Sequence, residues 1–113
     1  MEPTPATGRE SPTDASFVAH SEIRVPPDGA TGLTAAFRSR LGEVDGWPGF
    51  SHLEVWQDER DTQRFVMVSW WENRESFTNY MRSQSHRRSH DRIPTGPDAP
   101  RPAAFARFQV VAR

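Results

Sequence analysis

The stretch RFVMVSWWENRESFTNYMRSQSHRRSH, residues 64–90, decides the fold because it changes from a strand pattern to a helix pattern within a few residues. Its first part, Arg64 to Trp71, is a short run rich in the β-branched and aromatic residues that are typical of buried strands. Asn73 is suited to cap a helix, and Glu75 places a negative charge in the first turn, where the helix dipole favours it. The stretch therefore predicts a strand joined directly to a helix.

The segments on both sides of this junction complete an alternating order of strands and helices. Alternating apolar residues predict strands over Ser16–Val25, Ser51–Gln57 and Ala104–Ala112, with loops over residues 58–63 and 94–102. Leu33, Phe37 and Leu41 recur at helical spacing and predict a helix that ends near Gly42. A turn is predicted at residues 47–50, with a positive φ at Gly49. The order β-α-β-β-α-β is typical of a ferredoxin-like α+β fold, with a four-stranded antiparallel sheet and both helices on one face.

The strand over residues 64–71 is apolar on both of its faces. One face carries Phe65, Met67 and Trp71, and the other carries Val66, Val68 and Trp70. A sheet that is covered by helices on one side normally presents polar residues on the other. A second copy of the chain is the favoured cover, so we predict a homodimer of the dimeric α/β-barrel type in which two sheets pack face to face. The alternative is a ligand-binding face on a monomer.

Length and composition restrict the class of protein. The 113 residues suit one domain, expected over residues 16–113, after a proline-containing polar tail over residues 1–15 that we expect to be disordered. A net charge of −1 gives no reason to expect a nucleic-acid partner. No apolar run approaches the roughly 20 residues that span a membrane. The chain also lacks a signal-peptide pattern and cysteine, so the expected compartment is the cytoplasm.

Four segments carry a resemblance to a known family. The segments FVAHSEIRV (residues 17–25), WPGF (residues 47–50), the stretch over residues 64–90 and ARFQVV (residues 106–111) resemble the antibiotic biosynthesis monooxygenase superfamily of dimeric ferredoxin-like proteins. Within it, the second-helix region is most similar to the IsdG-like heme-degrading monooxygenases. The resemblance covers about Phe17 to Val111 and implies a monooxygenase that uses heme and molecular oxygen, with heme either as the cofactor or as the substrate.

The resemblance also implies which residues form the heme site. The iron-ligating histidine of the IsdG-like pattern falls on His90. Tyr80 stands where that pattern has a tryptophan against the porphyrin, and Ser21 stands where it has a hydrogen-bonding asparagine. Only the histidine is kept, and the two replacements bear on heme degradation more than on heme binding.

The residue types agree with parts of this site. A neutral imidazole is a good axial ligand for heme iron. Arg87 and Arg88 lie close enough in sequence to the histidine to meet heme propionates, for which a guanidinium is well suited. Trp71, Phe65 and Met67 are expected to line an open side that admits oxygen and excludes bulk water.

The position of His90 imposes a condition on the second helix. At 100° per residue, Phe77 and Tyr80 share one face of an unbroken helix, whereas His90 lies about 220° from Phe77. The helix must therefore kink or restart near Gln84 and Ser85 for His90 to reach the same pocket as Tyr80, and poor helix formers at these positions make a break reasonable. His86 is the competing iron ligand, on the same far face as His90 in the unbroken helix.

Several alternatives remain open at this point. His86 and His90 could bind zinc or another metal, or could form a solvated helix end together with Arg87 and Arg88. His20 and His52 read as hydrogen-bonded structural histidines on strands. A rival function without cofactor is an oxygenase that converts aromatic polyketide phenols to quinones with a histidine as the base. A third is a non-catalytic dimer that binds a hydrophobic ligand.

Overall fold

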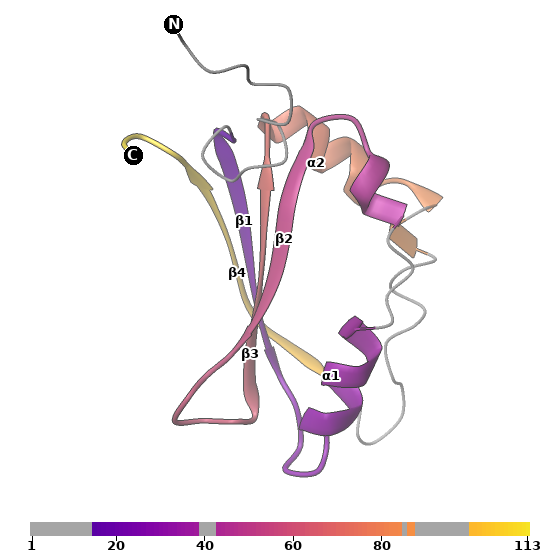
Figure 1. Cartoon of the computed structure of the whole chain (residues 1–113), viewed down its shortest axis with the longest axis vertical. Helices are drawn as coiled ribbons and strands as arrows, with labels where there is room; N and C mark the ends of the chain where they lie inside the picture. The colour runs from indigo at the N-terminus through magenta and orange to yellow at the C-terminus, as the bar shows by residue number, and fades with distance from the viewer. Residues whose placement is uncertain (1–14, 39–42, 85, 88–99) are drawn as a thin grey trace, which may run out of the picture.

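The computed structural model describes residues 15–38, 43–84, 86–87 and 100–113 (Figure 1). Four strands form one antiparallel sheet in the order β2-β3-β1-β4: β1 (Phe17–Arg24), β2 (Phe50–Gln57), β3 (Arg64–Trp71) and β4 (Arg101–Gln109). The other elements are α1 (Ala30–Arg38), a short 3₁₀ helix η3 (Glu43–Gly46) and α2 (Arg74–Met81). The prediction of a ferredoxin-like fold is therefore confirmed.

Both helices lie on one side of the sheet, at opposite ends of the strands, as Figure 1 shows. The pairing register fixes which residues share that face, because directly opposed residues point to the same side. Phe17 is paired with Trp71 across β1 and β3, and Phe50 is paired with Trp71 across β2 and β3. The helix-bearing face therefore carries Phe65, Met67 and Trp71 of β3, while Val66, Val68 and Trp70 belong to the outer face, as predicted.

Local signals at the start of α2 are confirmed. Asn73 is the N-cap residue, and its side-chain oxygen accepts a hydrogen bond from the backbone N–H of Ser76 at 2.9 Å. Gly49 has a positive φ of 85°, and its carbonyl accepts a hydrogen bond from the backbone N–H of Glu72 at 2.8 Å. An alanine Cβ at Gly49 would overlap the side chain of Ser76. The turn before β2 is thus packed directly against the first turn of α2.

The buried core is divided into two clusters on the helix-bearing face. The first cluster lies under α2 and consists of Phe17, Ala19, Val44, Trp71, Phe77 and Tyr80. The second lies under α1 and consists of Val25, Leu33 and Phe65. Phe65 and Trp71 are six residues apart on β3, which separates them by about 20 Å along an extended strand. Each end of the helix-bearing face is therefore covered by a different helix.

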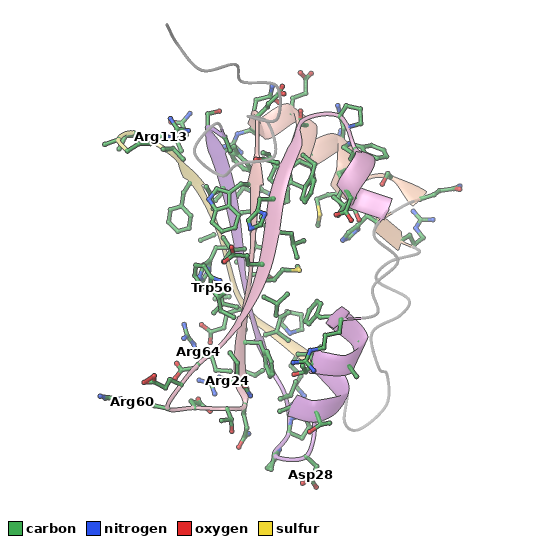
Figure 2. All side chains as sticks on the ribbon, viewed as in Figure 1. Arg24, Asp28, Trp56, Arg60, Arg64 and Arg113 are labelled. Carbon is green, nitrogen blue, oxygen red and sulfur yellow. The ribbon has the colours of Figure 1, made fainter. Side chains whose placement is uncertain are left out.

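The outer face of the sheet is apolar toward one end and charged toward the other. Val66 and Val68 are buried, whereas Trp56 is 47% exposed and Phe108 is 51% exposed. At the hairpin end, Arg64 contacts Glu22 at 3.1 Å and Asp58 at 3.0 Å. Figure 2 shows Trp56, Arg24 and Arg64 on the side away from the helices. The outer face thus presents exposed aromatic rings next to a compensated group of ion pairs.

Both ends of β4 differ from the sequence-based expectation, and several other predicted segments lie outside the described residues. β4 begins at Arg101 instead of Ala104 and ends at Gln109 instead of Ala112. Pro102 is tolerated there because β4 is an edge strand, where a missing N–H is not required for pairing on the open side. The tail over residues 1–14, the predicted end of α1 at residues 39–42 and most of the predicted loop at residues 94–102 lie outside the described residues.

Candidate functional site

A row of four residues crosses the helix-bearing face between the two core clusters. Val55, Met67, Ser21 and Phe105 are successive Cα partners on β2, β3, β1 and β4. We call these four residues the central row; at the usual strand spacing the row spans about 14 Å. Val55, Met67 and Ser21 are partly buried, and Phe105 is 50% exposed. The central row is thus a mostly apolar strip with one hydroxyl near its middle.

Of the predicted site residues on the strands, Ser21 and Met67 lie together on this strip, whereas Trp71 and Phe65 lie apart from each other. Ser21 is paired directly with Met67. Trp71 is buried in the first core cluster and Phe65 in the second, so they do not line one pocket with each other. They form the two ends of the helix-bearing face, and the central row lies between them.

An open groove continues the central row toward α1. It has a volume of about 380 Å³ and lies between α1 and the edge strand β2. The lining residues are Thr34, Phe37, Arg38, Leu53, Glu54, Val55, Gln57 and Phe65. Because Val55 belongs to both, the groove and the central row form one continuous surface.

The helix α2 ends where the geometry of the histidines requires a break. Its last residue is Met81 and its C-cap is Arg82, so the helix stops three residues before the predicted position at Gln84. Ser83 then caps a new helical turn: its hydroxyl accepts a hydrogen bond from the backbone N–H of His86 at 3.1 Å and donates one to the carbonyl of Tyr80 at 2.6 Å. The predicted interruption of this helix is therefore present.

This break changes the position of His86. In an unbroken helix His86 would lie on the far face, but its ring lies 5.3 Å from the ring of Tyr80 in an edge-to-face contact. Tyr80 is only 7% exposed and also contacts Trp71 at 5.6 Å and Trp47 at 5.4 Å between ring centroids. The chain thus turns a partly buried imidazole toward the aromatic cluster under α2.

Three predicted site residues are not brought into this cluster by the described part of the chain. Arg87 is exposed and follows directly after His86. Arg88 and His90 lie outside the described residues, so the expected iron ligand has no described geometry. Among the residues that the structure describes, no three histidine, aspartate or glutamate side chains gather as a metal site would require.

An arginine on β4, which sequence reasoning missed, lies next to the central row. Arg107 is paired with Ala19 of β1, and its guanidinium carbon lies 5.3 Å from the ring centroid of Phe105 and 5.8 Å from that of Phe77. Phe77 and Phe105 are themselves stacked, with centroids 6.1 Å apart. Only the register between β1 and β4 reveals this cluster, because no local sequence pattern links α2 to the last strand.

The two strand histidines lie on the outer face, away from the central row. His52 forms a hydrogen bond between its Nε2 and Glu54 Oε2 at 2.8 Å, and the indole N–H of Trp56 donates to Glu54 Oε1 at 2.7 Å. These hydrogen bonds from Trp56 and His52 lower the pKa of Glu54 below its usual value. The ring of His20 lies 6.2 Å from that of Phe108. The hydrogen bond expected for His52 is thus present.

Comparisons with known proteins agree with the architecture. Residues 16–92 match the antibiotic biosynthesis monooxygenase family. A heme oxygenase (staphylobilin-producing) of Staphylococcus epidermidis is 29% identical over 86 residues, which are 74% of this chain and 82% of that protein. The structure of the heme-degrader MhuD from Mycobacterium tuberculosis, with two hemes bound in its active site, has a TM-score of 0.71 at 24% identity and covers 86% of this chain and 97% of that one. Across the described residues, none of the helices has the length and apolar character of a membrane span.

Proposed function

This chain belongs to the antibiotic biosynthesis monooxygenase family and is therefore an enzyme of the monooxygenase class, and we propose that it binds heme on the central row and activates oxygen there. Two observations together carry the proposal. An apolar strip crosses the sheet, and the break after α2 turns His86 toward Tyr80. The similarity to a staphylococcal heme oxygenase and a mycobacterial heme-degrader supports heme as the ligand.

The described residues fit a flat, largely apolar ligand. The central row and the adjoining groove offer aliphatic, thioether and aromatic side chains over a continuous surface between the two core clusters. Binding sites for such ligands are usually apolar with a few well-placed polar groups. Ser21 supplies one such group, since its hydroxyl can donate a hydrogen bond to a polar atom held above the row.

The proposed iron ligand is His90, with His86 as the alternative. Support for a histidine ligand from the segment after α2 comes from the new helical turn that Ser83 caps, because this turn directs His86 toward Tyr80. An imidazole provides the axial bond, and bound heme supplies the one-electron and oxygen chemistry that the protein side chains lack. In this proposal Tyr80 acts as a rigid wall of the pocket, because contacts with Trp47, Trp71 and His86 restrict its ring.

We also propose that the outer face is covered by a second copy of the chain. Support comes from Trp56 and Phe108, which are each about half exposed on a sheet face that has no helix over it among the described residues. Two exposed aromatic side chains on one sheet face are typical anchors of an interface. The homodimer would leave the central row free, because that row lies on the opposite face of the sheet.

A hemin titration followed by absorbance tests the heme proposal. We expect a sharp Soret shift that saturates at a fixed ratio per chain, and we expect it to be lost in His90→Ala but retained in the matched variant His86→Ala. Reversal of this pattern between the two variants would assign the iron to His86. Adding a reductant in air then distinguishes heme as a substrate, which disappears, from heme as a cofactor, which persists.

A featureless titration of the unchanged protein would overturn heme binding. The cofactor-independent oxygenase would then become the leading function, with aromatic phenols as the substrates to test. A protein that binds hemin but neither consumes it nor oxidises an added substrate would favour a non-catalytic ligand-binding role instead.

A further inference from the structure

Arg107 lies at the β4 end of the central row, on the same face as the row itself. Its neighbour two residues earlier on that face, Phe105, is the fourth member of the row. The guanidinium lies over the Phe105 ring at 5.3 Å and near the Phe77 ring at 5.8 Å. These distances are those of cation–π contacts, which hold an arginine side chain in place without using its N–H groups.

The charge of Arg107 is not compensated within the described part of the chain. The ion pairs that the described residues form use Arg24, Arg64 and His52 as the cationic groups, at the hairpin end and on the outer face. Arg107 is exposed, and Phe105 beneath it is itself 50% exposed. A stacked guanidinium with free donors therefore lies at the open end of an apolar strip.

We propose that Arg107 binds a carboxylate of the ligand that lies on the central row. A planar guanidinium donates two parallel hydrogen bonds to a carboxylate, and the aromatic stack below it fixes the direction of that fork. The ligand class is thus a flat aromatic or macrocyclic carboxylic acid, with one carboxylate directed to the β4 edge. For heme this group is a propionate, and the inference rests on the heme-binding function proposed above.

The other arginines near the site are less suited to this role. Arg38 lines the groove beside α1 and β2, and none of the described residues that line this groove belongs to β1 or β4 at the open end of the central row. Arg87, which the sequence suggested as a propionate partner, is exposed beyond the end of α2. Arg107 combines a free positive charge with direct contact to a residue of the central row.

Binding of hemin and of hemin dimethyl ester, in which both propionates are esterified, tests the proposal. The two dissociation constants are measured by absorbance for the unchanged protein, for Arg107→Gln and for Arg101→Gln. Arg101 is the matched control because it is an exposed arginine on the same strand, paired with Arg24 of the outer face. Circular dichroism and a urea midpoint confirm that each variant is folded.

We expect Arg107→Gln to weaken hemin binding about five- to tenfold, because one charge-assisted hydrogen-bonded pair is lost. The affinity for the ester should change less than twofold, and Arg101→Gln should leave both affinities unchanged. Arg107→Lys, which retains the charge, should recover part of the preference for hemin over the ester.

The outcomes separate this inference from the function on which it rests. Equal weakening of both ligands by Arg107→Gln would show that the side chain only covers Phe77 and Phe105, and would overturn the carboxylate contact. Unchanged hemin binding would overturn it as well, while leaving the heme-binding function intact. An unchanged protein that binds neither ligand would overturn both proposals.

Discussion

Gly49→Ala is expected to lower the free energy of unfolding by about 2–5 kcal/mol. An L-residue at the φ of 85° that Gly49 adopts costs about 1–2 kcal/mol. The new methyl group would overlap the Cβ and Oγ of Ser76, and overpacking of this kind costs about 1–3 kcal/mol more. Because Cβ of Ser76 belongs to the first turn of α2, a rotamer change of the hydroxyl cannot relieve the overlap.

Urea unfolding, followed by tryptophan fluorescence and circular dichroism, measures this loss. For a domain of this size, 2 kcal/mol corresponds to a decrease of about 8–16 °C in Tm. Gly46→Ala is the matched control: it lies in the nearby 3₁₀ helix, and a Cβ there would meet no atom within 4 Å. This control should change the stability by less than about 1 kcal/mol.

A double variant then separates the two costs. Ser76→Gly removes the overlapping atoms but alone destabilises α2, so the double variant should be less destabilised than the sum of the two single variants by at least about 1 kcal/mol. If Gly49→Ala costs no more than Gly46→Ala, the close packing of the turn against α2 is wrong. Strictly additive losses in the two single variants would leave backbone strain as the whole cause of the Gly49→Ala effect.

Three further predictions follow from the cap, the carboxylate and the outer face. Asn73→Ala should cost about 1 kcal/mol in urea unfolding through loss of the bond to the Ser76 N–H, whereas Asn73→Asp should retain most of it; equal losses would exclude a capping role. Hydrogen bonds from Trp56 and His52 lower the pKa of Glu54 below 4.5. Their contribution to the free energy of unfolding is therefore present above about pH 4.5, and it disappears as the pH falls through the lower pKa of the folded state. Glu54→Gln should therefore show a shallower loss of stability below about pH 4.5, and an acid limb as steep as that of the unchanged chain would contradict this. Phe108→Arg should convert the proposed dimer to a folded monomer by light scattering, and an undiminished molecular mass would refute the face-to-face arrangement.

The sequence was sufficient for features that depend on short-range patterns. The bounds of β3, the cap at Asn73 and the positive φ of Gly49 follow from local sterics and hydrogen bonding, which neighbouring residues determine. A break after α2 was compatible with the poor helix formers around Ser83 and Gln84, although its exact position was not predicted. These features rest on one or two turns of backbone and do not require knowledge of distant pairing.

The rest of the candidate site depends on contacts between distant strands. Alternation indicated that Phe65 and Trp71 share a face, but not that two different helices enclose them in separate clusters. The role of Arg107 was hidden for the same reason: its position relative to Phe77 depends on the pairing of β1 with β4, which shifts register between Glu22 and Ile23. A pattern within one strand carries no information about such a register.

The division of the core into two clusters has a consequence for cooperativity. α1 contributes one buried side chain, Leu33, to its cluster, whereas α2 contributes Phe77 and Tyr80. Regions with fewer buried contacts open at a lower free energy, so the backbone amides of α1 should exchange with deuterium before those of α2. A ligand on the central row touches the strands between both regions and stabilises only the state in which both are closed. Ligand binding would then couple the two ends of the sheet into a single cooperative unit, with the largest gain in amide protection in α1, at the end of the sheet away from His86.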